Sequence, residues 1–480
     1  MGRPVTDVTH EMRQRALGAV VGSAVGDALG APFEFGPPGQ YSARFPRPVV
    51  GGTGEMVGGG AFGWEPGEFT DDTQMALVQA ESLIECGGPD PVDLFDRFRS
   101  WASGARDVGN QTRAVLGSDL VGSAAAAEHF SRHPGAAAGN GSLMRCVPTA
   151  VLCAVGGEDD SIEVARSTAA VTHGDPAAGW GTAIAHVIVR AAVRGTDPFT
   201  ALDAILDRLP DDQHRFRSML APEWAPTAMN VTNGSVWGCL AQAVWAVRST
   251  DSFADALITA IDLGGDTDTV AAVTGGLAGA IHGVAAIPSR WATYVNGTVT
   301  GPGGPRRYRL ADLQQLTARL LGTTIPPQQA LPASLGPSEV VPGIWAANLS
   351  GAMSAPEDWG VVSLCRVGAS LAAHPVRREF YLVDQAGDHN LDLAAVIDDA
   401  IATIDGFRAE GRQVLVHCFG GASRTGFVLR AWLMARRDLT DAEATALISR
   451  RWPHLSLWNR SFTQHLAERG RPAATGGERG

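Results

Sequence analysis

The stretch Ile261-Asp-Leu-Gly-Gly-Asp-Thr-Asp-Thr-Val270 decides how the first two thirds of this chain are interpreted. Two glycines precede alternating aspartates and threonines, and the small-residue run 270–283 that follows is typical of a closely packed helix. Carboxylates and hydroxyls gathered at a helix start either cap the helix or bind a cation. The stretch therefore predicts a helix whose first turn carries one of these two functions.

A matching cluster lies far upstream, in Phe69-Thr-Asp-Asp-Thr-Gln-Met75, where helical periodicity also begins. An N-cap needs only one acceptor oxygen, whereas Thr70, Asp71 and Asp72 supply three consecutive ones. Because both clusters contain only threonine and aspartate, together they favour one shared site for hard divalent cations.

A glycine-spaced helix is predicted over residues 11–30. Gly18, Gly22 and Gly26 recur every four residues, which gives the helix a smooth stripe on which a second helix can lie closely. Asp27 is different, because a carboxylate among small apolar residues needs a partner.

Three loops carry further polar residues. Glu34 follows the first helix, and the Gly/Pro-rich residues 37–69 are expected to be irregular. In Gly139–Arg145, a glycine-flanked asparagine either offers backbone N–H groups to an anion such as a diphosphate or forms a tight turn. The segment Thr172–Pro176 is predicted to break two helices and to expose the imidazole of His173.

The composition excludes several classes of function. A net charge of −12 argues against a nucleic-acid-binding surface. All 38 basic residues are arginine, so a lysine Schiff base and a Walker-type phosphate lysine are excluded. The six cysteines lack CxxC spacing and are expected to be reduced thiols. With no apolar leader and no apolar span of about 18 residues, we expect a cytoplasmic protein without a membrane partner.

The chain divides into two regions with different hydrophobic patterns. Helical periodicity without alternating strands predicts an all-α domain at 5–321, followed by a Pro/Gly-rich linker at 322–337. Residues 338–470 alternate short strands with helices, which predicts an α/β domain, and the tail 471–480 is expected to be disordered. The strands are expected at 340–346, 360–364, 379–383 and 413–417, and the helices at 391–410 and 425–436.

Residues 10–295 resemble the ADP-ribosylglycohydrolase family, because several motifs occur in the family's order. These motifs are Gly26-Asp-Ala-Leu-Gly30 with Pro32 and Glu34, Thr70-Asp-Asp-Thr73, Gly139-Asn-Gly-Ser-Leu-Met-Arg145, Thr172-His173 and Gly265-Asp-Thr-Asp-Thr269. The resemblance implies an all-α bundle around two Mg²⁺ or Mn²⁺ ions. It implies these metal ligands: Thr70, Asp71, Asp72, Asp266, Asp268 and Thr269.

By the same resemblance, Glu34 would be a mobile catalytic carboxylate, and Asn140, Ser142 and His173 would lie near the ADP-ribose. The expected activity is removal of ADP-ribose from protein side chains or from a small derivative. Carboxylate-held cations can orient ribose hydroxyls and activate water, and a nearby anion stabilises an oxocarbenium-like transition state. The residues 135–139 lack side-chain donors, so a diphosphate would have to be bound by backbone N–H groups. No motif identifies the leaving group as arginine, serine or another derivative.

A second motif, Val414-Leu-Val-His-Cys-Phe-Gly-Gly-Ala-Ser-Arg-Thr-Gly426, lies in the α/β region. A buried strand runs into Cys418, and Arg424 follows at the start of a helix. The loop N–H groups and the helix start would stabilise a thiolate and bind phosphate. Cys418 would then attack phosphorus, while Arg424 would bind the phosphate oxygens. Ser423 and Thr425 could donate hydrogen bonds, Thr425 to the leaving thiolate.

This region resembles the dual-specificity group of the protein tyrosine phosphatases over about 338–468, which implies hydrolysis of a phosphorylated substrate through a phosphocysteine. The general acid of that group would be Asp384 or Asp388, and Asp384 is favoured because it ends an apparent strand. The main prediction is a bifunctional hydrolase. The alternatives are a glycohydrolase with a non-catalytic phosphate-binding module and, least favoured, a non-catalytic ADP-ribose-binding protein.

Overall fold

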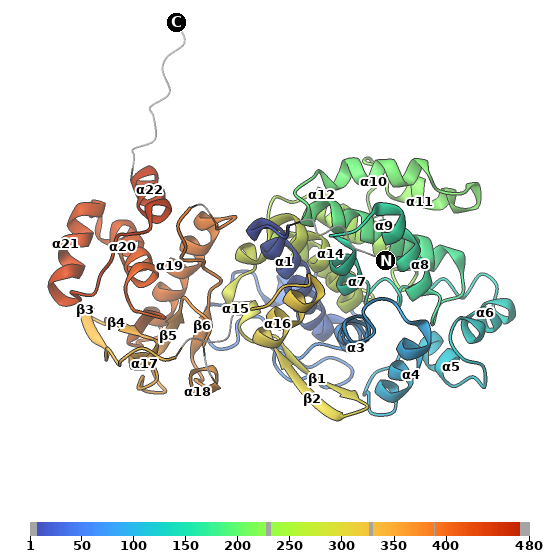
Figure 1. Cartoon of the computed structure of the whole chain (residues 1–480), viewed down its shortest axis with the longest axis horizontal. Helices are drawn as coiled ribbons and strands as arrows, with labels where there is room; N and C mark the ends of the chain where they lie inside the picture. Colours follow the sequence, from blue (N-terminus) through green and yellow to red (C-terminus); the bar gives the residue numbers. More distant parts are fainter. Residues whose placement is uncertain (1–6, 227–231, 326–329, 368, 388, 471–480) are drawn as a thin grey trace, which may run out of the picture. The chain divides into compact units, whose positions relative to one another are not determined.

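The computed structural model describes residues 7–226, 232–325, 330–367, 369–387 and 389–470. They form two compact units, one made mainly of residues up to 325 and the other mainly of residues from 330 onward (Figure 1). The first unit is helical and the second is an α/β unit with a mixed sheet, as the sequence predicted. The predicted disordered tail, 471–480, lies outside the described residues.

The first unit is built from helices and one hairpin. Its helices are α1 His10–Gly30, α2 Gln40–Arg44, α3 Asp71–Glu85, α4 Pro91–Ala102, α5 Asn110–Leu116, α6 Ser123–Arg132, α7 Val147–Cys153, α8 Glu158–Ala169, α9 Pro176–Val193, α10 Pro198–Asp207, α11 His214–Met219, α12 Val236–Arg248, α13 Phe253–Ile261, α14 Thr267–His282, α15 Ser289–Ala292 and α16 Leu310–Leu320. Its strands are β1 Asn296–Gly301 and β2 Gly304–Arg309.

The centre of this unit is the close pairing of α1 with α14. A Cβ added at Gly18, Gly22 or Gly26 would lie 2.1, 2.3 or 2.0 Å from a backbone oxygen of α14. Only glycine permits this approach, so the predicted smooth stripe is confirmed. The helices run antiparallel, and Thr267 at the start of α14 donates its hydroxyl to the carbonyl of Gly30 at the end of α1, at 2.9 Å. The Asp/Thr cluster therefore lies beside the end of α1.

Three sequence expectations for this unit need correction. The region 37–69 contains the short helix α2, and the unit is not purely helical because β1 and β2 form an antiparallel hairpin. An apolar span of the excluded length does exist, since His10–Phe33 has a mean hydropathy of 1.4 over an 18-residue window. In the structure 94% of that window is buried within the protein, because its small residues pack against neighbouring helices such as α14.

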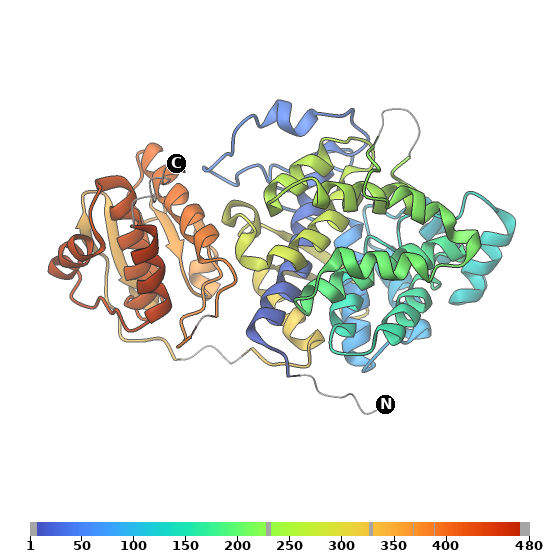
Figure 2. The same cartoon turned by 90° about the horizontal axis from the view of Figure 1, so that it is seen from above.

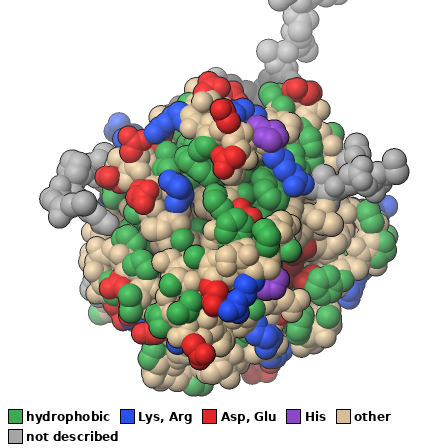
Figure 3. Space-filling model, turned by 90° about the vertical axis from the view of Figure 1, so that its right-hand side faces the viewer, with side chains coloured by type: hydrophobic (Ala, Val, Ile, Leu, Met, Phe, Trp, Pro, Cys, Tyr) green, Lys and Arg blue, Asp and Glu red, His purple; other side chains and the backbone are tan. Residues whose placement is uncertain are grey.

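Charged side chains of both signs are interspersed on one face of the molecule. The view in Figure 3 looks onto the side at which α5, α6 and α11 are drawn in Figure 1. Acidic and basic groups alternate there with hydrophobic and neutral ones, so no patch of a single sign covers that face.

The second unit is a five-stranded sheet flanked by helices. Its strands are β3 Ser338–Val341, β4 Ile344–Asn348, β5 Gly360–Ser363, β6 Arg377–Glu379 and β7 Val414–Cys418. Its helices are α17 Leu349–Ala352, α18 Ala369–Ala372, α19 Leu393–Ala409, α20 Ser423–Arg437, α21 Asp441–Arg451 and α22 Arg460–Arg469. In Figure 1, α19 and α20 lie on one side of the sheet and α17 and α18 on the other, and Figure 2 shows the same helices from above.

The strand order β3-β4-β7-β5-β6 puts β7 at the centre, parallel to β4 and β5. Two strand predictions were wrong in detail. The expected strand 340–346 is two strands, because Gly343 turns the chain at φ 82°, and the expected strand 379–383 ends at Glu379. Ligands of parallel sheets bind beyond the carboxyl ends of the strands, and Cys418 ends β7 at that edge.

Candidate functional site

The start of α3 is held by a carboxylate from α1. Asp27 accepts hydrogen bonds from the backbone N–H of Thr70, at 2.9 and 3.1 Å, and from that of Thr73, at 3.0 Å. These amides lack partners within the helix, so Asp27 caps α3 from outside and has the partner that the sequence required. Burial raises the pKa of Asp27 to about 6, although these hydrogen bonds oppose the rise.

The start of α14 is fixed by backbone turns and by two asparagines. Gly264 and Gly265 have φ of 75° and 76°, a region that favours glycine. The Oδ1 of Asn233 accepts from the N–H of Asp266 at 3.1 Å. The Nδ2 of Asn140 donates to Oδ2 of Asp266 at 2.8 Å, which orients that carboxylate.

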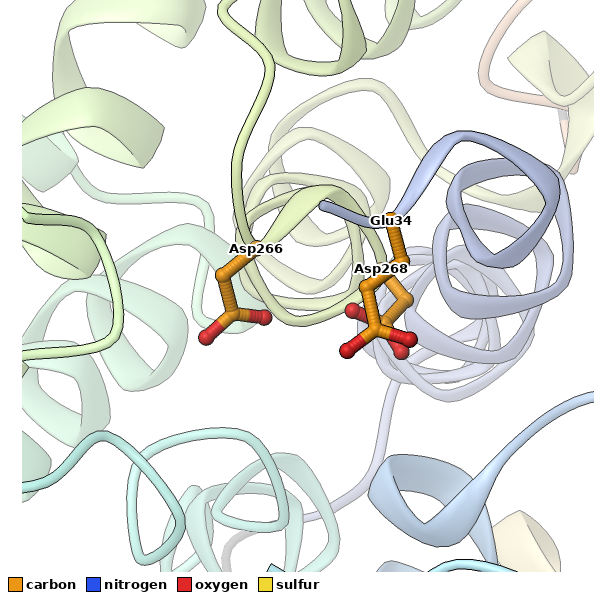
Figure 4. Close-up of side chains that lie close together, drawn as sticks. All are labelled: Glu34, Asp266 and Asp268. Carbon is orange, nitrogen blue, oxygen red and sulfur yellow. The ribbon is translucent and has the colours of Figure 1, made fainter. Parts of the chain in front are cut away.

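Glu34 reaches the same place through a short backbone bridge. The N–H of Phe35 donates to the carbonyl of Gly265 at 2.6 Å, and the N–H of Gly265 donates to the carbonyl of Gly36 at 3.0 Å. This pairing ties the loop after α1 to the turn before α14. Carboxylate oxygens of Glu34, Asp266 and Asp268 consequently lie within 4.8 Å of one another, with Glu34 and Asp268 overlapping in the view of Figure 4.

Burial and neighbouring carboxylates raise the pKa values of several carboxyl groups at this site. Burial raises the pKa of Glu34 to about 8, with further increases from Asp266 and Asp107. Burial, together with neighbouring carboxylates, also holds the pKa values of Asp71, Asp72 and Asp268 well above the usual range for aspartate. Several buried anions at one point need compensating positive charge.

The donor set fits a hard divalent cation. The Oδ1 of Asp72 is buried and has no hydrogen-bond partner among the described residues. Its other oxygen, Oδ2, lies 3.4 Å from the hydroxyl of Thr70, and Thr269 also hydrogen-bonds to this carboxylate. All six residues predicted as ligands therefore lie at the adjacent starts of α3 and α14, and all offer oxygen, which Mg²⁺ and Mn²⁺ prefer.

Two residues of this site were missed by sequence analysis. Asp107, in the loop before α5, is close enough to raise the pKa of Glu34 and Asp71. It stands between Arg106 and Val108 without any repeated spacing, so no pattern marked it. No sequence pattern marked Asn233 either, because it acts by accepting a hydrogen bond from Asp266, which lies in a turn far along the chain.

The residues predicted near ADP-ribose, Asn140, Ser142 and His173, are all buried. Asn140 contacts Asp266, and its own backbone N–H donates to Gly234 at 3.2 Å, so this N–H is not free to bind an anion. The Oγ of Ser142 is buried and lies 3.1 Å from the hydroxyl of Thr182 on α9. Direct contact of these side chains with a substrate stays a prediction.

His173 was expected to be exposed, and that expectation was wrong. Its ring is 3% exposed, and its Nδ1 lies 2.8 Å from the hydroxyl of Thr172, which in turn accepts from Arg145. Burial and then the charge of Arg145 lower the pKa of His173, so the ring stays neutral. The imidazole packs beneath the backbone of Gly139 and Gly141 and supports that turn.

The second unit carries the cysteine loop between β7 and α20. Arg424 donates from Nη1 to the carbonyls of Leu364, at 2.9 Å, and Leu382, at 3.3 Å. The hydroxyl of Thr425 is buried and finds no partner in the described part of the chain. Beneath the loop, Oγ of Ser363 lies 2.7 Å from Nε2 of His417, and burial lowers the pKa of His417 to about 4.

Asp384 adjoins this loop. Its Oδ1 accepts from Oγ of Ser423 and from Nδ2 of Asn459, each at 3.0 Å. Its Oδ2 lies 3.7 Å from Nε of Arg424. The other candidate acid, Asp388, lies outside the described residues. The structure thus brings Asp384 to the cysteine loop, as a general acid there would require.

Comparisons with known proteins agree with the first site. The ADP-ribosylglycohydrolase family model matches residues 8–329. The ADP-ribosylarginine hydrolase Tri1 of Serratia proteamaculans is 33% identical over 296 residues, which are 58% of this chain and 75% of that protein. A solved ADP-ribosylglycohydrolase-related protein complex is 31% identical with a TM-score of 0.51, and covers 66% of this chain and 99% of its own.

The chain belongs to the ADP-ribosylglycohydrolase family. This family is metal-dependent, and the acidic cluster at Glu34, Asp266 and Asp268 could hold a cation in this member. The resemblance inferred from motif order is confirmed.

This ADP-ribosylglycohydrolase carries a second domain. The catalytic-domain model of the dual-specificity phosphatases matches residues 367–471. The dual specificity protein phosphatase 1 of Arabidopsis thaliana is 27% identical over 135 residues, which are 28% of this chain and 68% of that protein. The chain is therefore a hydrolase with a phosphatase-type domain at its C-terminal side.

Proposed function

We propose that the first unit removes ADP-ribose from arginine side chains. The observation that carries this proposal is the bridge between Gly36 and Gly265, which sets Glu34 beside Asp266 and Asp268. In the reaction, water adds to C1″ of the ribose, and the bond from C1″ to the guanidinium nitrogen breaks. The nitrogen leaves with a proton, and free ADP-ribose is released.

Each residue has a defined part in this proposal. The clusters at 70–72 and 266–269 would hold two Mg²⁺ or Mn²⁺ ions, which when bound supply an activated water and orient the ribose hydroxyls. Glu34 would exchange a proton with the attacking water or the leaving nitrogen, as a carboxylate on a loop can do. Asp27 and Asn140 would position the ligand clusters through the hydrogen bonds described above.

The charge of the site favours arginine over a neutral leaving group. Besides the predicted aspartate ligands, the carboxyl groups of Asp27, Glu34 and Asp107 adjoin the cluster. This is more negative charge than two divalent cations neutralise, so a guanidinium leaving group would be attracted. The relative Tri1 is named for the same linkage.

An assay of purified full-length protein tests this function. With Mg²⁺ or Mn²⁺ present, ADP-ribosylarginine peptides should release ADP-ribose, and Glu34→Gln should slow release by about 10²-fold or more. Matched peptides modified on serine report whether the linkage is selected. Equal turnover of the serine peptides, or an unchanged kcat in Glu34→Gln, would contradict the proposal.

For the second unit, a cysteine-dependent phosphatase is favoured by the contact of Asp384 with the cysteine loop. The Sγ of Cys418 would attack phosphorus while the ester oxygen leaves with a proton from Asp384. Water would then hydrolyse the phosphocysteine and release inorganic phosphate. Arg424 would bind the phosphate oxygens through its guanidinium.

The alternative is a module that binds phosphate without turnover. Hydrolysis of an aryl phosphate by the full-length protein, lost in Cys418→Ser, separates the two. The variant should retain inorganic phosphate binding, because Arg424 and the loop N–H groups remain. Phosphate binding without any turnover in the wild type would establish the non-catalytic alternative.

A further inference from the structure

Packing in the protein interior explains neither the exposure of Phe35 nor its backbone conformation. It is 71% exposed, more than any other large hydrophobic side chain among the described residues. It is also one of two non-glycine residues there with positive φ, at 61°. A phenylalanine at such a backbone angle is strained, and its ring gains little from burial.

The backbone cannot relax without moving the candidate site. The N–H of Phe35 donates to Gly265 at 2.6 Å, and the next residue completes the bridge to the turn that precedes Asp266. The strain is therefore kept by the same pairing that positions Glu34.

The neighbouring aromatic residues show that a buried aromatic cluster lies close to Phe35. Phe33 is 5% exposed, and its ring packs edge-on against Tyr41 at 5.6 Å and Phe45 at 6.4 Å between centroids. Phe33 therefore points into the unit, whereas Phe35 points out of it. An exposed aromatic ring next to a catalytic carboxylate is suited to contact with a substrate.

We propose that the ring of Phe35 covers the guanidinium of the ADP-ribosylated arginine and so selects this leaving group. This inference rests on the proposed function of the first unit. Glu34 acts where the C1″–nitrogen bond breaks, so the residue next to it adjoins the leaving group. The leaving group belongs to another protein and must approach from solvent, where the Phe35 ring is.

The chemistry of the surroundings favours a cation on this ring. A guanidinium stacked on an aromatic face is stabilised by the ring's quadrupole, and nearby carboxylates add attraction. The carboxyl groups of Asp266, Asp107 and Asp27 all act electrostatically on Glu34, the neighbour of Phe35 in the chain. A neutral serine leaving group would gain neither interaction.

The test compares Phe35→Gly with Phe35→Tyr in the full-length protein. Glycine accepts the 61° backbone angle without strain, so the loop keeps its place while the ring is removed. In Phe35→Gly we expect KM for an ADP-ribosylarginine peptide to rise about 5- to 10-fold with kcat nearly unchanged. Phe35→Tyr keeps an aromatic face and should restore the wild-type KM.

Two further measurements distinguish this role from others. The inhibition constant of free ADP-ribose should be the same in wild type and Phe35→Gly, because the product lacks the leaving group. An increase would show that the ring contacts ADP-ribose itself and would overturn the inference. An unchanged KM for the arginine peptide in Phe35→Gly would overturn it too.

The matched control is Leu331→Gly, which removes another exposed apolar side chain, 49% exposed, from outside the first unit. It should leave KM unchanged. Failure of the proposed function is recognised differently, since wild-type protein would then not hydrolyse the arginine peptide at all. In that case both the proposed function and the role of Phe35 would be wrong. If the wild-type protein hydrolyses the arginine peptide, the variants test the role of Phe35 alone.

Discussion

At the scale of single residues, the oxygen Oδ1 of Asp72 shows that buried negative charge at the start of α3 lacks a compensating partner in the described part of the chain. It is buried without a hydrogen-bond partner in the described residues, and burial, followed by the charges of neighbouring aspartates, raises the pKa of its carboxyl group. A protein that keeps such an atom needs a cation there, or a proton. Binding of a cation would favour the ionised carboxylates and remove the mutual repulsion.

Loss of the carboxylates should therefore remove the metal. In Asp71→Asn/Asp268→Asn, we expect bound Mn²⁺ measured after gel filtration to fall from two ions per chain to less than one. Asp96→Asn is the control, because Asp96 is exposed on α4. Equal metal content in wild type and the double variant would contradict the site.

The buried ring of His417 should make the stability of the second unit depend on pH, and the direction of this dependence can be predicted. Its buried ring has a pKa lowered to about 4, against about 6.5 in the unfolded chain, so the folded state binds fewer protons between these values. Its contribution to stability is full above pH 6.5 and is lost as pH falls toward 4, on the order of 3 kcal/mol. Urea unfolding of the second unit at pH 7 and pH 4.5 should show a smaller difference in His417→Gln than in wild type.

At the scale of residues, the sequence predicted candidate site residues where several side chains of the same chemical kind stand close together in the chain. The two Asp/Thr clusters and the cysteine loop stand out because several functional side chains are adjacent in the chain. Asp107 and Asn233 act through contacts made only after folding, so single-sequence patterns could not find them. The exposure of His173 was misjudged because a break between helices usually lies at the surface, and here the turn 139–141 covers it.

At the scale of elements, the contact of α1 with α14 determines the geometry of the site. In Gly22→Ala the added methyl would meet the carbonyl oxygen of Gly275 at 2.3 Å, so the helices must separate. We expect a loss of about 1–3 kcal/mol in the free energy of unfolding, together with weaker Mn²⁺ binding. Gly301→Ala, where an added Cβ meets nothing within 4 Å, is the control and should change neither quantity.

A second prediction at the scale of elements concerns the start of α22. Asn459 caps α22 by accepting from Ser461, and it also donates to Asp384. Asn459→Ser keeps a capping oxygen but is too short to hold Asp384. Hydrolysis of alkyl phosphates, which need a proton on the leaving oxygen, should slow by up to about 10²-fold, and aryl phosphates much less. Equal slowing of both would indicate a purely structural role for Asn459.

Long helices such as α1, α3 and α14 could be predicted, because apolar or small-residue periodicity and, for α3, a cap at Thr70 mark them in the sequence. The hairpin β1–β2 could not, since β2 is largely exposed and its residues Gly304–Arg309 show no apolar alternation. The bridge between Gly36 and Gly265 pairs single residues far apart in the chain, and no local pattern predicts it.

At the scale of the whole molecule, one chain contains two sets of candidate catalytic groups that share no residue. Asp268→Asn should abolish release of ADP-ribose and leave aryl phosphate hydrolysis intact, and Cys418→Ser should do the reverse. Measuring both activities in both full-length variants checks this separation. Loss of both activities in either variant would mean that the two sets of groups are energetically coupled.

The pairing of α1 with α14 also sets an order of events during synthesis. Thr267 and Gly30 are in contact although 237 residues separate them. At about 5–20 residues per second, the ribosome needs roughly 10–50 s to make that interval, during which the apolar first helix has no α14 to cover it. The nascent chain therefore exposes this long apolar helix for a period in which a chaperone could bind it. A cation at the proposed site could bind only afterwards, because a nascent chain that ends before residue 266 contains only half of the predicted ligands.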